Sequence, residues 1–258
     1  MMRLDKYLSA ALGVSRSEAR KTIAAGRVAV DGAPCKKADA PLDEARQAVA
    51  VDGRELGGAY QPYVYLMLNK PAGVVSASRD AREVTVADLV RDAFPRRTLF
   101  PAGRLDKTST GFVLLTDDGA FAHAILAPGR HVAKRYRVTL DTPLTPAMTA
   151  GFAAGVTLAD GETMAPALAV PADPADPCAA LVTLHQGVYH QIKRMFGVYG
   201  AGVNGLHRLG IGPVALDETL APGGWRALTA AEVESLRAAA RRPAKPGAAA
   251  QNGDAAAK

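Results

Sequence analysis

Leucines recur with the spacing of a helix at the start of the chain. They occupy every fourth position from Leu4 to Leu12, and Gly13 follows them. This pattern predicts a short helix that ends at the glycine. The next segment, SRSE at 15–18, has the form of a capping box, in which the serine and the glutamate each bind a backbone amide of the other residue. A second helix is therefore predicted from this box to Gly26.

Alternation of apolar and polar residues replaces the helical spacing after the second helix. In RVAVDG at 27–32 both valines face the same side, and the closing Asp-Gly is a hairpin signal. QAVAVDGREL at 47–56 matches the returning strand. Residues 2–56 are therefore predicted to form a small unit of two helices and a hairpin. LGGAYQP at 56–62 is predicted to be a linker, because it combines Gly and Pro with no apolar period.

Strand-like runs outnumber helix-like runs in the rest of the chain. The predicted strands are YVYLMLNKP at 63–71, GFVLLTDDG at 111–119, AKRYRVTL at 133–140 and AALVTLHQG at 179–187. The predicted helices are AFAHAIL at 120–126, YHQIKRMFGVYG at 189–200 and TAAEVESLRAAA at 229–240. The sequence lacks the regular alternation of strands and helices that is typical of a parallel α/β sheet. It also lacks a glycine-rich phosphate loop. We therefore expect an α+β fold with a mixed, mainly antiparallel sheet.

These patterns divide the chain into three parts. We expect a small N-terminal domain at residues 1–60, a larger domain at 61–240 and a tail at 241–258. The tail is of low complexity, RRPAKPGAAAQNGDAAAK, and is predicted to be disordered.

Composition narrows the class of protein. The chain has 258 residues, of which 48% are hydrophobic, and a formal net charge of +6, which suits a polyanionic partner. Cys35 and Cys178 are far apart and have no His or Cys at ligand spacing, which argues against a disulfide framework or a structural zinc site. No apolar run approaches the roughly 20 residues that span a bilayer. The N-terminus also carries charges where a secretion signal needs apolar residues, so we expect a cytoplasmic protein with no membrane contact.

Basic residues gather in the first unit. Residues 1–37 contain eight Lys or Arg and three acids, a balance that a solvated helix face would also show. The order helix–helix–strand with RLDKYL, SRSEAR and GRVAVDG is more specific. Over residues 2–48 it resembles the RNA-binding module named after the fourth small-subunit ribosomal protein, the αL motif. The resemblance implies contacts with RNA, and the residues expected to make them are Arg3, Arg16, Arg20, Lys21 and Arg27.

A single carboxylate stands among cations in GRLDKTSTGFVLLTDDG at 103–119. Asp106 lies between Arg104 and Lys107, in front of an apolar run. A lone motif of this kind is most often a turn with a solvated ion pair. The alternative is a working carboxylate in a basic pocket, held rigid by the strand behind it.

Tyr136 is the aromatic residue of AKRYRVTL. On a strand it faces the side opposite to Arg135 and Arg137. One interpretation is an amphipathic tyrosine at a sheet edge. The other is an aromatic platform for a nucleobase, with cations nearby for phosphates.

GVYHQIKRMFG at 187–197 contains no acid, so Lys193 and Arg194 lack a local acidic partner. A distant carboxylate would satisfy one of them. His190 by itself is typical of a structural or surface histidine, since no second His or Cys stands at metal-ligand spacing.

Together, these three segments resemble three motifs of the pseudouridine synthases, in the same order, and specifically the ribosomal small-subunit (RsuA-like) branch. With the αL module in front and YLMLNKPAG opening the second domain, the resemblance covers about residues 2–232. Two positions depart from the family pattern: Gln186 stands where Glu is frequent, and Phe112 replaces a usual leucine.

The resemblance implies a role for individual residues. Asp106 corresponds to the essential catalytic aspartate, Tyr136 to the tyrosine that contacts the target base, and Lys193 to the basic residue that pairs with the catalytic carboxylate. Ile192 beside it is assigned to substrate binding. Arg104 is expected to fill the space that the extruded base vacates or to grip a phosphate.

The implied reaction isomerises uridine to pseudouridine: a glycosidic C–N bond breaks, the uracil rotates and a C–C bond forms. No redox change or external atom is needed, so no cofactor and no metal are expected. A base inside folded RNA must first be extruded, at a cost of a few kcal/mol. Asp106 must be ionised, which a neighbouring Lys193 favours. Attack on the sugar, attack on the base and removal of a sugar proton all stay open for this carboxylate.

The expected substrate is 16S rRNA in a small-subunit assembly intermediate, modified at one uridine by a monomer, as in the enzymes that act at uridine 516. Three alternatives stay open: a 23S rRNA synthase of the neighbouring branch, a non-catalytic RNA-binding protein of ribosome assembly, and a nuclease. The last ranks lowest, because such sites gather several carboxylates around metal ions.

Overall fold

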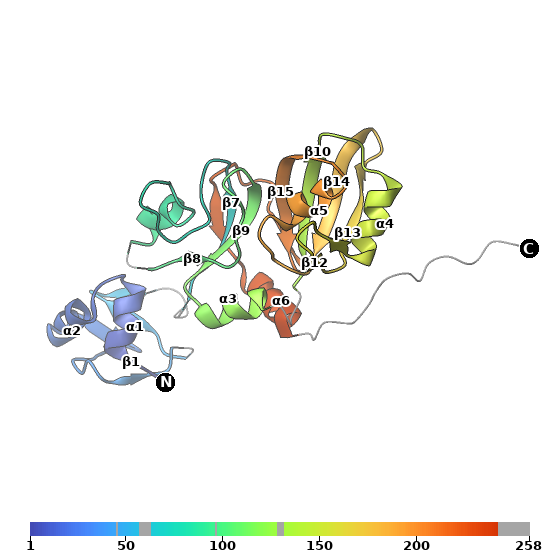
Figure 1. The fold of residues 1–258 in the computed structure, drawn as a ribbon. Helices are drawn as coiled ribbons and strands as arrows, with labels where there is room; N and C mark the ends of the chain where they lie inside the picture. Colours follow the sequence, from blue (N-terminus) through green and yellow to red (C-terminus); the bar gives the residue numbers. More distant parts are fainter. Residues whose placement is uncertain (45, 57–62, 96, 128–131, 242–258) are drawn as a thin grey trace, which may run out of the picture. The chain divides into compact units, whose positions relative to one another are not determined.

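The structure is a computed structural model that describes residues 1–44, 46–56, 63–95, 97–127 and 132–241. The chain divides into two compact units (Figure 1): unit 1 comprises residues 1–63 with 95–97, and unit 2 comprises 64–94 with 98–258. Residues 57–62 of the predicted linker and 242–258 of the predicted tail lie outside the described residues.

Both helices predicted for unit 1 are confirmed. Helix α1 spans Leu4–Ala11, and the turn after it passes through Gly13 at a φ of 62°. Helix α2 spans Arg16–Ala24 and begins with the predicted capping box. The hydroxyl of Ser15 accepts from the amide of Glu18 at 3.2 Å, and the amide of Ser15 donates to the Glu18 carboxylate at 2.8 Å. Two backbone donors at the helix N-terminus are thereby satisfied.

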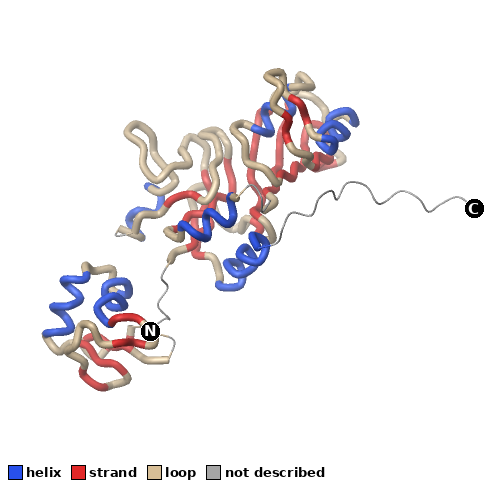
Figure 2. Tube along the Cα trace, turned by 60° about the horizontal axis from the view of Figure 1, so that its bottom comes forward, coloured by secondary structure: helices blue, strands red, loops and turns tan. Residues whose placement is uncertain are grey.

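Short strands complete unit 1. A four-stranded sheet has the order β3-β2-β5-β6, and β1 pairs separately with β4. The predicted hairpin turn has positive φ at both central residues, Asp31 and Gly32, as a two-residue hairpin requires. The two helices lie over these strands (Figure 2) and share one apolar core with them. The strands are β1 Met2–Arg3, β2 Val28–Val30, β3 Ala33–Pro34, β4 Pro41–Leu42, β5 Val49–Val51 and β6 Arg54–Glu55.

A nine-stranded sheet forms the frame of unit 2 among the described residues, with the central order β13-β14-β10-β15-β9-β7-β17. All its pairings are antiparallel except that of β9 with β15, which confirms the α+β expectation. The strands are β7 Tyr65–Lys70, β8 Phe100–Pro101, β9 Thr110–Thr116, β10 Lys134–Leu140, β13 Leu168–Asp173, β14 Asp176–Leu184, β15 Val203–Ile211, β16 Val214–Ala215 and β17 Trp225–Ala227. Strands β11 Val156–Thr157 and β12 Thr163–Met164 pair apart from it.

Helices cover both faces of this sheet. Along β7 and β9, neighbouring residues point to opposite sides, so Leu66 and Val113 belong to one apolar cluster and Met67 and Phe112 to another. The first cluster includes residues of α4 and α5, and the second includes residues of α3 and α6. The unbroken apolar runs of these strands follow from this double burial. The helices are α3 Gly119–Leu126, α4 Pro146–Ala154, α5 Gln191–Gly197 and α6 Ala230–Arg241, with the 3₁₀ helix η1 at Asp88–Ala93.

Two of the differences from the sequence prediction in unit 2 bear on the site. The helix predicted at 189–200 is shorter, Gln191–Gly197, because His190 before it has a left-handed backbone with a φ of 50°. The long central strand β15 was not predicted, because its two glycines and its polar residues obscure the apolar alternation. Its parallel pairing with β9 depends on Gly111, which has a φ of 98° and where a Cβ would overlap the backbone of Arg208.

Candidate active site

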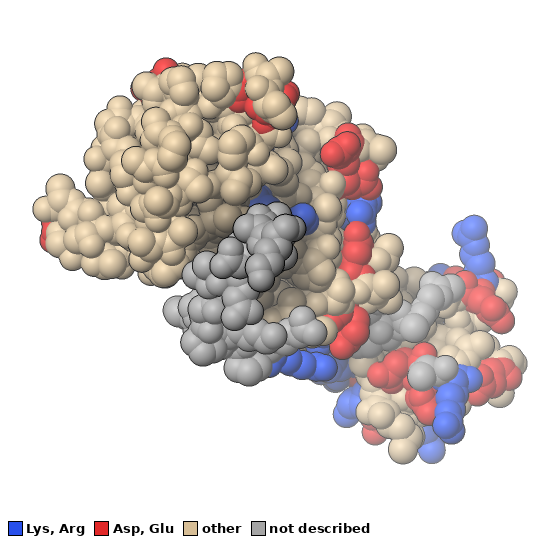
Figure 3. All heavy atoms as spheres, turned by 90° about the vertical axis from the view of Figure 1, so that its right-hand side faces the viewer, with Lys and Arg blue, Asp and Glu red and all other residues tan. Residues whose placement is uncertain are grey.

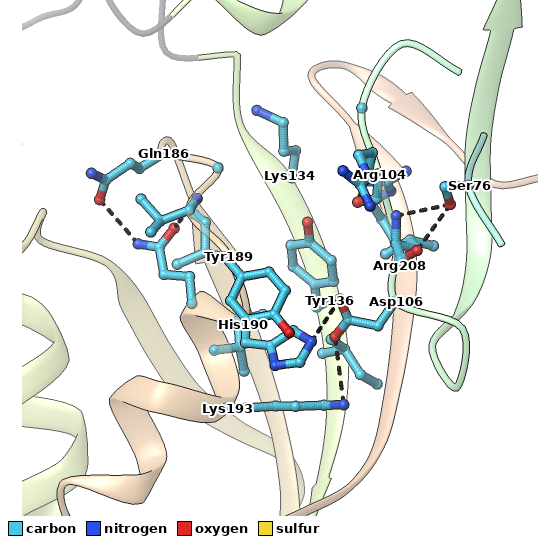
Figure 4. A pocket seen from close by; sticks show the side chains of 18 of the residues that line it. Ser76, Arg104, Asp106, Lys134, Tyr136, Gln186, Tyr189, His190, Lys193 and Arg208 are labelled. Atoms are coloured by element: carbon cyan, nitrogen blue, oxygen red, sulfur yellow. Dashed lines mark hydrogen bonds and ion pairs between the residues drawn. The ribbon is translucent and has the colours of Figure 1, made fainter. Parts of the chain in front are cut away.

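A cavity of about 620 Å³ opens in unit 2 and gathers residues from the three motif segments. Figure 4 shows it from close by, with the loop of Asp106 on one side and the segment before α5 on the other. Five residues singled out from the sequence line it, namely Arg104, Asp106, Tyr136, Ile192 and Lys193. The volume lies within the range typical of small-molecule sites.

Asp106 meets two side chains that come from α5 and the residue before it. Its Oδ2 lies 3.5 Å from Nζ of Lys193, and its Oδ1 lies 3.3 Å from Nε2 of His190. The carboxylate side chain keeps 28% of its surface exposed, so it is open to the cavity. Lys107 pairs instead with Glu83 at 2.7 Å. Among the described residues, Asp106 therefore pairs with groups that are distant in the sequence rather than with its neighbours Arg104 and Lys107.

His190 is a site residue that sequence reasoning missed. The sequence suggested a structural or surface histidine, yet its ring contacts the Asp106 carboxylate. In the sequence His190 falls within the helix predicted at 189–200, and its contact with Asp106 depends on the fold.

Buried groups hold the loop of Asp106 in place. The Ser76 hydroxyl donates to the carbonyl of Leu105 at 2.9 Å and accepts from its amide at 3.0 Å. The ammonium of Lys70, fully buried, donates to the carbonyls of Pro71, Lys107 and Ser109 at 3.0, 3.2 and 2.7 Å. Burial lowers the pKa of Lys70 to about 8. These hydrogen bonds thus fix the backbone of the loop on both sides of Asp106.

Two further cations lie at the back of the cavity. Arg208, 1% exposed, donates through Nε to the carbonyl of Phe112 at 2.6 Å and through Nη1 to that of Arg104 at 3.5 Å. Lys134 is also buried and donates to the carbonyl of Val132 at 3.1 Å. Burial, together with the charge of Arg208, lowers the pKa of Lys134 to about 8. Neither residue was among the site residues predicted from the sequence, although Lys134 was one of the cations noted beside Tyr136.

Tyr136 lies inside the sheet. Strand β10 pairs with β14 on one side and with β15 on the other, which excludes the sheet-edge interpretation. The side chain is 7% exposed and faces the cavity, and Arg135 and Arg137 point to the other side of the sheet and are exposed. Ile192, 4% exposed, belongs to the same apolar cluster as Tyr136. Together they provide an aromatic ring and an aliphatic contact for a planar ligand.

Both cations of α5 pair with distant carboxylates, whereas the sequence suggested such a partner for one of them. Lys193 pairs with Asp106, and Arg194 pairs with Asp160 at 2.7 Å and with Glu162 at 2.9 Å. Arg104 is exposed at the cavity, and within the described parts of the chain its side chain forms no ion pair. It is therefore available to an anion.

A second cluster of cations lies in unit 1, around one buried carboxylate. Asp5 has no exposed side-chain surface, and Arg3, Arg16 and Arg20 approach it at 3.2, 2.9 and 2.9 Å. Burial opposes ionisation, but the hydrogen bonds from the three arginines outweigh it and hold the pKa of Asp5 well below its usual range. The arginines keep 50%, 49% and 54% of their side chains exposed. Their outer N–H groups are thus free to meet an anion while the inner ones are held.

The other two cations predicted for RNA contact lie outside this cluster. Arg27 pairs with Asp52, and Lys21 is exposed on α2.

The described residues contain no group of three or more His, Cys, Asp or Glu side chains that could hold a metal ion. None of the described helices is long and apolar enough to cross a membrane.

Charge is unevenly spread over unit 2. Figure 3 views the molecule from the side of α4, where most of the described surface of unit 2 carries neither Lys or Arg nor Asp or Glu. A polyanion would find few cations on this face. The cavity, in contrast, is lined by Arg104, Lys107, Lys134, Lys193 and Arg208.

Both units of the chain match known protein families. Residues 64–197 match the family described as RNA pseudouridylate synthase, and residues 2–47 match the S4 domain. The ribosomal small subunit pseudouridine synthase A of Salmonella typhimurium is 41% identical over 235 residues, which cover 91% of this chain and 100% of the relative. An uncharacterized RNA pseudouridine synthase of Bacillus subtilis is 40% identical over 236 residues, 91% of this chain and 98% of the relative.

A solved structure gives the same result. A crystal structure of a pseudouridylate synthase is 36% identical, with a TM-score of 0.63, and the match covers 92% of this chain and 100% of that one. The chain therefore belongs to the RNA pseudouridine synthase family and carries an S4 domain at its N-terminus.

Proposed function

We propose that this protein isomerises one uridine of 16S rRNA to pseudouridine, with Asp106 as the catalytic carboxylate. The observation that carries the proposal is the position of Asp106, partly exposed in a cavity of about 620 Å³ beside Lys193. The names of the relatives, ribosomal small subunit pseudouridine synthase A, support the choice of RNA.

The cavity supplies what the isomerisation needs. Every atom of the product comes from the substrate nucleotide, so the protein must supply an ionised carboxylate, a place for the base and a fixed orientation. Lys193, 3.5 Å away, places a positive charge beside the Asp106 carboxylate. The ring of Tyr136 offers its face to the uracil. Ile192, which belongs to the same apolar cluster as Tyr136, gives the uracil an aliphatic contact. Arg104, exposed at the cavity, binds a phosphate of the target strand.

Unit 1 binds RNA without taking part in the reaction. Its phosphate contacts come from Arg3, Arg16, Arg20, Lys21 and Arg27, of which the first three are arranged around Asp5. A boundary between an RNA-binding domain at 1–60 and a catalytic domain at 61–240 agrees with the family matches.

The substrate is the RNA of a small-subunit assembly intermediate, and the enzyme acts on it as a monomer in the cytoplasm. Extrusion of the base is cheapest where the RNA is not yet held by tertiary structure or by ribosomal proteins. The named relatives come from bacteria, and bacteria assemble their ribosomes in the cytoplasm.

The test offers the purified chain 16S rRNA, 23S rRNA, small-subunit assembly intermediates and mature small subunits, and maps every new pseudouridine. We expect one new pseudouridine, in 16S rRNA, formed faster in the intermediates than in mature particles. Modification confined to 23S rRNA would overturn the choice of RNA and leave the reaction intact. Equal rates on mature particles would refute the proposed timing.

Asp106→Asn tests the catalytic assignment. This variant should lose isomerisation and still bind 16S rRNA within a few-fold of the wild type, because the amide keeps the shape of the side chain. Asp92→Asn, which changes an exposed carboxylate outside the cavity, is the matched control and should stay active. Isomerisation by Asp106→Asn near the wild-type rate would falsify the assignment.

A further inference from the structure

Tyr189 and His190 form a stack of two rings at the cavity. Their ring centroids are 3.8 Å apart and the ring planes differ by 16°. Both residues line the cavity, and Figure 4 shows Tyr189 in front of His190, with Asp106 beside the histidine. The stack therefore lies next to the candidate catalytic carboxylate.

The inner ring of this stack is firmly held. His190 has a φ of 50°, a left-handed conformation that is uncommon for a residue with a Cβ. Its Nε2 lies 3.3 Å from Asp106. Such backbone conformations concentrate at functional sites, where surrounding contacts maintain them. The histidine thus gives Tyr189 a fixed support.

The outer ring is open to the solvent. The Tyr189 side chain is 74% exposed, and within the described residues His190 is its only stacking partner. Tyr136, in contrast, is 7% exposed inside the cavity. The cavity therefore offers an interior ring to the base that enters it and an exterior ring to a base that stays outside.

We propose that the exposed face of Tyr189 stacks on a nucleobase that neighbours the target uridine. The proposal rests on the proposed function, since it places the target inside the same cavity. Aromatic side chains bind bases of single-stranded RNA through their faces, and every base has such a face. Stacking on the neighbour holds the strand at the mouth of the cavity while the target base is turned inward. The contact selects unstacked RNA and does not read the sequence.

The test measures binding of the full chain to two single-stranded RNAs of about seven nucleotides with a central uridine. In the first, the flanking residues are ordinary nucleotides. In the second they are dihydrouridines, whose rings are neither aromatic nor planar and stack poorly. Tyr189→Ala should weaken binding of the first RNA about five- to tenfold and leave binding of the second nearly unchanged.

Two variants serve as controls. Tyr189→Phe keeps the ring and should bind both RNAs as the wild type does. Tyr63→Ala removes another exposed tyrosine, 41% exposed, that does not line the cavity, and should also change nothing. An equal loss on both RNAs, or no loss on the first, would overturn the proposal. Since binding is measured without isomerisation, failure of the proposed function would show itself separately, as an absence of pseudouridine in 16S rRNA treated with the wild-type chain.

Discussion

The Nζ atom of Lys193 lies 3.5 Å from the Asp106 carboxylate, although the two residues come from different elements, α5 and the loop before β9. Their side chains are 32% and 28% exposed. A pair with this exposure is screened by water and contributes little to folding stability, on the order of 1 kcal/mol or less. Its importance lies in the charge that it places beside the carboxylate.

Lys193→Met should therefore reduce pseudouridine formation far more than stability. We expect a loss of roughly a hundredfold in kcat/KM, in line with the removal of one electrostatic group from an active site. The unfolding free energy should change by less than about 1 kcal/mol. Lys193→Arg keeps the charge and should retain part of the activity. Rate measurements and urea unfolding on the same preparations check both parts. A Lys193→Met enzyme as active as the wild type would contradict the role given to this cation.

Lys134 predicts a pH dependence of stability. Burial lowers its pKa from the ordinary 10.5 to about 8 in the folded chain. The unfolded chain then binds more protons than the folded one between these two values, so stability must rise with pH in that window. Between pH 8 and 10, the wild type should gain about 2 kcal/mol relative to Lys134→Met. Trp225, the one tryptophan of the sequence, lies in unit 2 and reports its unfolding in urea. Parallel pH profiles for the two proteins would show that Lys134 ionises as an ordinary lysine.

The arginines around Asp5 predict the salt dependence of RNA binding. Arg16→Gln/Arg20→Gln removes two charges but keeps N–H donors that can still bind the buried carboxylate, so unit 1 should stay folded. The slope of log affinity against log salt should become shallower by about 1.5 to 2, because two phosphate contacts are lost. The matched control is Arg135→Gln/Arg137→Gln, on the exposed side of β10 away from the cavity. An unchanged slope in the first variant would mean that these arginines form only a solvated face.

The position of Gly111 in the central sheet leaves no room for a larger side chain. A Cβ at this position would overlap the carbonyl oxygen of Arg208 and lie 2.7 Å from its amide nitrogen, and the φ of 98° is strained for any residue with a Cβ. Gly111→Ala should destabilise unit 2 by at least about 2 kcal/mol. Gly119→Ala, with open space around the new methyl group, should be neutral or slightly stabilising. Urea unfolding of both variants, followed at Trp225, checks the contrast. Equal stability of the two would show that the β9–β15 pairing can relax.

The sequence by itself determined the elements that depend on neighbouring residues. The capping box at Ser15, the hairpin turn at Asp31 and Gly32, and the alternation that buries Tyr136 were all predicted and are present. Each of these depends on the backbone geometry of a few consecutive residues, or on a side-chain period of two or 3.6, and both are visible in the order of the residues. The motif resemblance pointed to Asp106 in the same way, through a short ordered pattern.

Only the tertiary structure decided which groups surround that carboxylate. Three contacts join residues that are distant in the sequence. His190 contacts Asp106, Lys70 supports the loop of Asp106, and Arg194 pairs with Asp160. Strand β15 escaped prediction for the same reason, since its place in the sheet depends on the close approach that Gly111 permits. The partner of a charge, and the burial that shifts its pKa, depend on how distant segments pack together, and no local pattern of residues encodes that packing.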